Sequence, residues 1–154
     1  KLLPTIRSRC QIVPFIRLSD YHVNNIIQKL DVVKERNNIP NDEMKELIAF
    51  SYGSPGRYLT NIQYWFDISN ALRQKLDIKL INQIEILQLA KEITDELNIE
   101  QQLWLLDFQQ NRIWTQENNS TMVKKLEELR KQLLTYVQPR LAWEITLLEI
   151  NLSN

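Results

Sequence analysis

Apolar positions recur along most of this chain at intervals of three and four residues, the spacing that gathers side chains on one face of an α-helix. Asparagine, serine and proline interrupt the pattern between successive stretches, as they do where helices end and begin. In chain order the predicted helices cover residues 20–36, 42–52, 54–66, 86–97, 103–113, 123–137 and 141–152. Residues 67–80 are mostly helical in character but carry no clear stripe. The chain is therefore expected to be mainly α-helical.

Three of these stripes predict which side chains are buried. The helix over 54–66 is expected to bury Leu59, Ile62 and Phe66. The helix over 123–137 has the cleanest stripe, made by Val123, Leu126, Leu129, Leu133 and Val137. The last helix is apolar on most sides, with Leu141, Trp143, Ile145, Leu147, Leu148, Ile150 and Leu152. A helix of that kind is either central in its fold or covered by a partner.

Residues 1–18 depart from the helical pattern. They carry Lys1, Arg7, Arg9 and Arg17 and no acidic residue. Residues 11–18, QIVPFIRL, are apolar and β-branched, which predicts a short strand, and Pro14 would place it at the edge or end of a sheet. Since a single strand is not stable by itself, the rest of that sheet is expected to lie outside this chain.

The composition excludes several classes of function. The 154 residues include two glycines and five prolines, too few for the turns of most all-β folds. Gly53 and Gly56 cannot form a dinucleotide fingerprint or a Walker A loop. The 19 Lys and Arg balance the 19 Asp and Glu, which argues against a strongly cationic nucleic-acid binder. Cys10 and His22 are the only cysteine and histidine, so we expect neither an internal disulfide nor a metal site.

The chain has no apolar run long enough to span a bilayer and no signal-peptide pattern. We therefore expect a soluble, cytoplasmic protein with no membrane partner. The four tryptophans, Trp65, Trp104, Trp114 and Trp143, are expected to be anchors in a core or an interface.

Two short motifs carry candidate chemistry. The first, Arg7-Ser8-Arg9-Cys10, places two arginines just before the predicted strand. Arginine is always charged, and its planar fork matches phosphate oxygens. A loop arginine attached to a core strand can reach across an interface, which is what a finger acting in trans requires. Cys10 is expected to be a small buried side chain rather than a nucleophile.

The second motif is Gly53-Ser54-Pro55-Gly56-Arg57. Gly53 is a left-handed C-cap candidate, and Ser54 with Pro55 is typical of a helix start. The N–H groups at such a start attract anions, Gly56 would allow close backbone approach, and Arg57 adds a charge in the first turn.

Both motifs resemble those of the AAA+ clamp-loader subunits of bacterial DNA polymerase III. The stretch PTIRSRCQ resembles the family's Ser-Arg-Cys motif, and GSPGRYL resembles the start of its third lid helix. The stretch RLAWEITLLEINL resembles the last collar helix. The delta-prime branch is the most similar, and motif order and spacing agree along the whole chain.

The resemblance implies a C-terminal fragment with three parts. Residues 1–18 would be the end of an AAA+ module with one short strand, residues 19–68 a three-helix lid, and residues 69–154 an α-helical collar that assembles the loader ring. The nucleotide-binding loop would lie upstream. No catalytic activity is then expected from the chain itself, although its parent would be a component of a DNA-directed DNA polymerase holoenzyme.

The resemblance also implies roles and partners. Arg9 would be a trans-acting arginine finger at the γ-phosphate in a neighbouring subunit, with Ser8 and Cys10 positioning its loop and Arg7 in a supporting contact. No cofactor would be bound here, and ATP with Mg²⁺ would sit in the neighbour. The implied partners are gamma/tau and delta subunits and, through the assembly, the sliding clamp and primed DNA.

The lid motif departs from the pattern of the ATPase members. They carry an arginine where this chain has Gly56, and Arg57 stands one place later, about 100° round a helix. This argues against nucleotide sensing by Arg57 and favours the delta-prime branch. One alternative is a fragment of a gamma/tau-type ATPase subunit. The other is a helical protein-interaction adaptor unrelated to AAA+ proteins, for which Arg9 would be dispensable.

Overall fold

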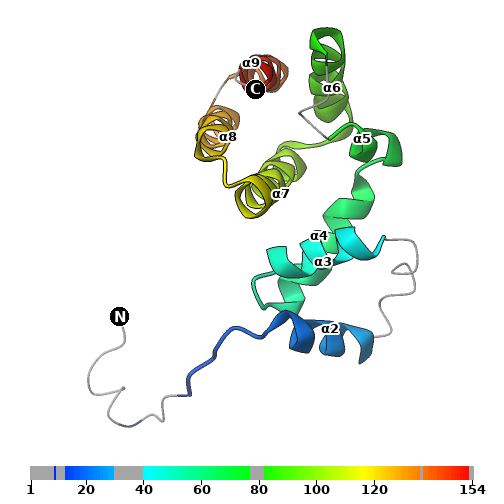
Figure 1. Cartoon of the computed structure of the whole chain (residues 1–154), viewed down its shortest axis with the longest axis vertical. Coiled ribbons are helices and arrows are strands. Elements are labelled where there is room, and N and C mark those ends of the chain that lie inside the picture. Colours follow the sequence, from blue (N-terminus) through cyan, green and yellow to red (C-terminus); the bar gives the residue numbers. More distant parts are fainter. Residues whose placement is uncertain (1–8, 10–12, 30–39, 77–81, 136, 153–154) are drawn as a thin grey trace. The chain divides into compact units, whose positions relative to one another are not determined.

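A computed structural model describes residues 9, 13–29, 40–76, 82–135 and 137–152. These residues form eight α-helices and no strand (Figure 1). The chain divides into two compact units, Lys1–Tyr58 and Leu59–Asn154, with the boundary inside one helix. The mainly α-helical prediction is confirmed, and the division into AAA+ end, lid and collar stays a prediction.

The first unit contains helices α2 (Asp20–Lys29) and α3 (Asn41–Phe50) and the first turn of α4 (Pro55–Asp67). Helices α2 and α3 pack together. The N–H of His22 bonds to the Ser19 Oγ at 3.4 Å, as expected of a serine at a helix start. Buried apolar side chains of both helices form a small core: Val23, Ile27, Leu47, Ile48 and Phe50.

The first two helices begin at or within one residue of their predicted starts. The first helix begins at Asp20 as expected, and its predicted second half falls at 30–39, outside the described residues. The second helix begins at Asn41, but its N-cap is Pro40, which has no side chain that could bond to the helix. The helix predicted over 42–52 therefore begins one residue earlier than expected, and neither Asn41 nor Asp42 is its N-cap.

The strand predicted over 11–18 is not formed in the part that the structure describes. Val13–Leu18 has no regular secondary structure, and Phe15 is 96% exposed. Residues 11 and 12 lie outside the described residues. The correction has a physical reason: a strand needs a neighbour to accept its hydrogen bonds, and the described residues contain no other strand.

The second unit is built around four helices: α6 (Gln83–Glu96), α7 (Ile99–Glu117), α8 (Ser120–Leu133) and α9 (Pro139–Asn151). Helix α7 packs against α8, α8 against α9, and α9 against α6, and the short α5 (Asn70–Gln74) also contacts α6 (Figure 1). Buried side chains from all four long helices form the core: Ile86, Leu89, Ala90, Ile93, Leu105, Leu106, Phe108, Leu126, Leu129, Leu133, Trp143, Leu147 and Ile150.

Asparagine begins three of the four bundle helices. The side chains of Asn82 and Asn98 each complete a capping box with the residue three places on, Glu85 and Gln101. The Asn119 side chain accepts bonds from two N–H groups at the start of α8. Such caps satisfy N–H groups that would otherwise lack a partner, so the polar breaks in the sequence fix where the helices begin.

Two predicted stripes are offset from the observed ones. Helix α8 ends at Leu133, so Val137 lies outside it and is 40% exposed, while Met122 joins the buried set. In α4, Leu59, Ile62 and Phe66 are half-buried, and the buried positions are Tyr58, Asn61 and Trp65. Two of the buried residues contact α7: Asn61 bonds to Trp104, and the Trp65 ring lies against Phe108.

Candidate functional site

The turn between α3 and α4 carries the second sequence motif. Gly53 has φ +77°, as predicted for a left-handed residue, and Tyr52 before it has φ +50°. The Gly53 carbonyl accepts a hydrogen bond from the N–H of Leu18 at 3.3 Å. A Cβ added to Gly53 would lie 2.4 Å from the Leu18 carbonyl oxygen, too close for any side chain. Glycine is therefore required here by backbone conformation and by packing.

Two arginines flank the Tyr52 ring. The guanidinium carbon of Arg57 lies 5.3 Å from the ring centroid and that of Arg17 lies 5.9 Å from it, both within cation–π range. The sequence reasoning missed Arg17 and Tyr52. Their only signal was an aromatic residue directly before the turn glycine. The arrangement gives Arg57 a contact within the chain, and the prediction that it does not sense nucleotide stays a prediction.

The start of α4 confirms the helix cap predicted for the second motif. Pro55 is the first helical residue, and the Arg57 N–H bonds to the Ser54 Oγ at 3.3 Å, so Ser54 caps the helix as predicted. Gly56 was expected to allow close backbone approach. An added Cβ there would meet only the Ser54 Oγ, at 4.0 Å. No packing among the described residues therefore requires glycine at position 56, and the close approach of an anion there stays a prediction.

We predict opposite results for alanine at the two glycines. Gly53→Ala is expected to destabilise the first unit by about 1–3 kcal/mol from left-handed strain alone, with the clash at Leu18 adding to it. Gly56→Ala, the matched control, should leave stability unchanged or raise it by up to about 1 kcal/mol. Amide hydrogen exchange in α2 and α3 measures both. Equal protection in the two variants would contradict the assignment of Gly53.

Arg9 is the described residue of the first motif. It lies in an exposed turn. Arg7, Ser8 and Cys10 fall outside the described residues, so their predicted supporting roles stay predictions. Among the described residues, no group of three or more His, Cys, Asp or Glu side chains is placed to hold a metal ion.

Aromatic side chains connect the second half of α4 to α7. The indole N–H of Trp104 donates to the Asn61 Oδ1 at 2.9 Å, and both residues are buried. The Phe108 ring stacks on Trp104 with centroids 5.5 Å apart and lies 5.3 Å from Trp65. Trp65, Trp104 and Trp143 are core anchors as predicted, whereas Trp114 is 55% exposed.

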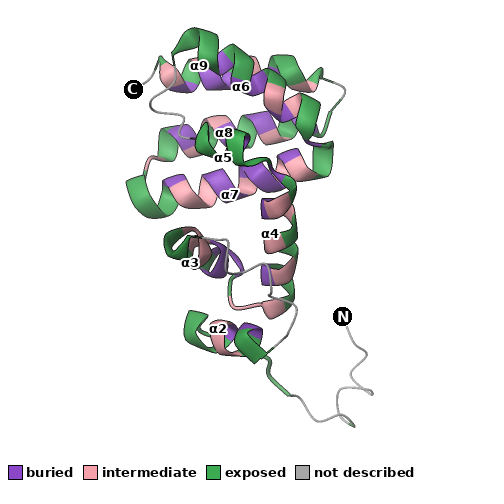
Figure 2. Ribbon diagram, turned by 90° about the vertical axis from the view of Figure 1, so that its right-hand side faces the viewer, coloured by how far each residue is buried: buried purple, intermediate pink, exposed green. Residues whose placement is uncertain are grey.

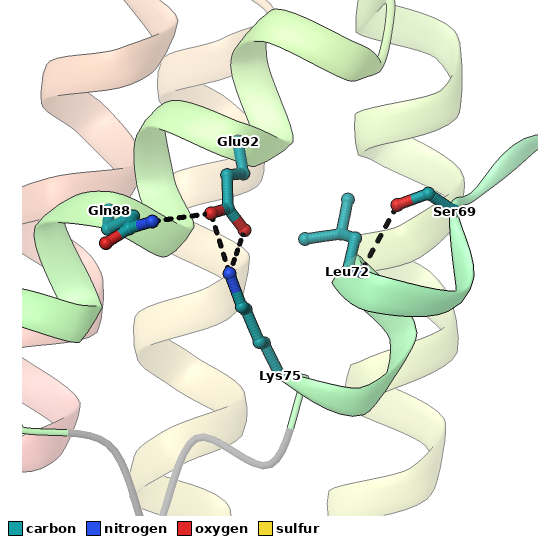
Figure 3. A network of polar contacts seen from close by, with 5 residues as sticks. All are labelled: Ser69, Leu72, Lys75, Gln88 and Glu92. Carbon is teal, nitrogen blue, oxygen red and sulfur yellow. Dashed lines mark hydrogen bonds and ion pairs between the residues drawn. The ribbon is translucent and has the colours of Figure 1, made fainter.

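An ion pair joins α5 to α6 (Figure 3). The Lys75 ammonium lies 2.7 and 2.8 Å from the two carboxylate oxygens of Glu92, and Gln88 donates to the same carboxylate. The hydrogen bond from Lys75 is the main reason that the pKa of Glu92 lies below its ordinary 4.5; burial opposes the shift and Gln88 adds to it. Lys75, Gln88 and Glu92 therefore serve to hold the end of α5 against α6.

Helix α9 presents a second apolar face opposite its core face. Trp143, Leu147 and Ile150 point into the bundle. Leu141, Ile145 and Leu152 are 47%, 46% and 76% exposed, and Leu148 is half-buried between them. We call these four residues the outer stripe. Figure 2 shows exposed and buried stretches alternating along α9. The sequence predicted an apolar helix, and the 4-3-4 spacing of the outer stripe was the signal for two separate faces.

Comparison with known proteins identifies the family. A family model described as cyanobacterial DNA polymerase III delta prime, C-terminal domain, matches residues 22–150. The chain belongs to this family. No curated protein matches the chain significantly, and no solved structure does. Family membership implies the role of a clamp-loader subunit of DNA polymerase III and association with the other subunits of that assembly.

The family match bears differently on the candidate sites. It covers the Gly53–Arg57 turn and nearly all of α9, and it begins after Arg9. The resemblance to the delta-prime branch is thereby confirmed, and the unrelated adaptor is set aside. Among the described residues, no helix is both long and apolar enough to cross a bilayer.

Proposed function

We propose that this chain assembles the loader through the helical bundle of residues 59–154 and lends Arg9 to the ATP site of a neighbouring subunit. The observation that carries the assembly proposal is the outer stripe of α9. Three leucines and one isoleucine follow one another along a helix whose other face already forms the core. Leaving such a stripe in water is unfavourable, and contiguous exposed apolar surface marks interaction sites.

The neighbouring helix supports the choice of face. Helix α8 turns charged side chains outward, among them Lys124, Glu127, Glu128 and Lys131, all exposed. That surface is well solvated and needs no partner. Within the same bundle, α9 therefore offers the face that another subunit would cover, which is the property expected of a collar.

The Arg9 proposal rests on exposure, residue type and the motif. An exposed turn leaves a guanidinium able to reach another chain, and its planar fork can bond two phosphate oxygens at once. Arg9 would stabilise charge developing on the γ-phosphate of ATP bound with Mg²⁺ in a gamma/tau-type neighbour. The chain would bind no nucleotide itself and would act on the sliding clamp and primed DNA only through the assembly.

A gamma/tau-type ATPase subunit is the second candidate. It would carry an arginine at position 56, where this chain has glycine. The adjacent Arg57 lies against Tyr52. These two features favour a subunit that completes a neighbour's site over one that senses its own nucleotide.

Ile145→Asp in the loader assembled from full-length subunits tests the proposal. Covering an isoleucine is worth about 1.5–3 kcal/mol, and an aspartate adds the cost of burying a charge. Co-elution with the other subunits should weaken by at least ten-fold, measured by size exclusion with light scattering. Trp114→Asp, which removes an exposed apolar side chain from α7, is the matched control. Assembly unaffected by Ile145→Asp would overturn the proposed role of α9.

A further inference from the structure

The outer stripe of α9 has the spacing of a coiled-coil seam. Leu141, Ile145, Leu148 and Leu152 follow one another at intervals of four, three and four residues. This alternation corresponds to positions d, a, d and a of a heptad, the arrangement that receives the side chains of another helix. A helix is therefore the element whose shape fits this face.

Carboxylates line both edges of the stripe. Glu144 and Glu149 lie about 70° to either side of its centre at 100° per residue, the g and e positions of the same heptad. Residues at these positions set partner choice through charge. The charge of these edge residues therefore restricts which helices can bind, whereas the apolar seam would accept any apolar helix.

Cations of this chain already approach both edges from the side away from the stripe. The Arg140 Nε lies 2.8 Å from the Glu144 Oε1, and Arg140 is a further 40° or so from the seam by the same helical geometry. The Lys125 Nζ donates to the main-chain oxygen of Glu149 at 2.6 Å, from α8, which packs on the core side of α9. The Glu144 carboxylate has about four acceptor positions, so the contact from Arg140 does not saturate it.

A second copy of this chain is a poor occupant. Pairing two such stripes in either direction sets Glu144 and Glu149 against like charges, which is destabilising.

We propose that the outer stripe of α9 accepts an α-helix of a different loader subunit that has its own apolar seam and basic residues along the edges. The proposal rests on the proposed function and adds the chemistry of the partner helix. Hydrophobic contact supplies attraction to any apolar helix, and the edge carboxylates select a basic one and reject a second α9.

The test uses two labelled helical peptides with leucine at every a and d position. One carries lysine at e and g, and the other carries glutamate there. Fluorescence anisotropy with the whole chain should show at least ten-fold tighter binding of the lysine peptide, with the preference shrinking in high salt. Ile145→Asp and Leu141→Gln should both abolish binding, and Trp114→Asp, the control on α7, should not. Circular dichroism checks that each variant is folded.

Several results would overturn the proposal: equal binding of the two peptides, binding of neither, or binding that survives both substitutions in the stripe. A stable homodimer of the chain in light scattering would do so too. The experiment distinguishes a wrong partner chemistry from a wrong proposed function. If the peptides show no charge preference but Ile145→Asp still disrupts loader assembly, the collar role stands and only the basic partner is wrong.

Discussion

Arg9→Ala in the full-length subunit is expected to slow ATP hydrolysis by a neighbouring motor subunit on the order of 10³-fold or more at the site it completes. The reason lies in the proposed function: the guanidinium would meet the charge that develops on the γ-phosphate, an interaction stronger in the transition state than in the ground state. Binding of ATP should therefore change much less than its hydrolysis.

The measurement is single-turnover hydrolysis in an assembled loader in which that neighbour holds the only intact ATP site. Arg9→Lys keeps the charge but loses the planar fork, so it should restore only part of the rate. Lys124→Ala removes an exposed cation from α8 and is the matched control. A full rate in the Arg9→Ala loader, with assembly intact, would contradict the finger.

Trp143→Ala is expected to lower the free energy of unfolding of the bundle by about 3–5 kcal/mol, the range for deleting a large buried aromatic side chain. Trp143 is 3% exposed and lines a small internal cavity, so its removal enlarges a gap that the surrounding helices already leave open. The indole N–H also donates to the Gln102 Oε1 at 3.0 Å, and Gln102 in turn donates to the Leu97 carbonyl oxygen at 2.8 Å.

Trp143→Phe separates the two contributions. It keeps much of the apolar volume but leaves the buried Gln102 oxygen without its donor, which should cost about 1–3 kcal/mol. Trp114→Phe on the exposed part of α7 should stay within about 0.5 kcal/mol of the unsubstituted chain. Denaturant unfolding followed by circular dichroism measures all three. A Trp143→Ala chain as stable as Trp114→Phe would show that Trp143 does not anchor the core.

The turn between α3 and α4 shows how much of a site local sequence specifies. Gly53, Ser54 and Pro55 adopt the conformations predicted for them, because a left-handed turn, a capping hydroxyl and a first-turn proline depend on their own backbone. The contact between Arg17 and Tyr52 was not predictable, because the two residues are 35 positions apart in the sequence. They meet where the N–H of Leu18 bonds to the Gly53 carbonyl oxygen, and that bond depends on the fold.

By itself the sequence determined the helical class, the order of the longer helices and the family, although the predicted starts of α6, α7 and α8 are three or four residues late. Helical periodicity, asparagine caps and glycine conformation act within a few residues, so they can be read without knowing the fold. The tertiary structure decided which of two possible faces each helix buries. In α4 the rings of Trp104 and Phe108 select Trp65 over Phe66, and in α9 the bundle takes Trp143 and leaves Ile145 outside. Which face is buried depends on the helix that lies opposite, and the spacing of apolar residues within one helix does not identify that neighbour.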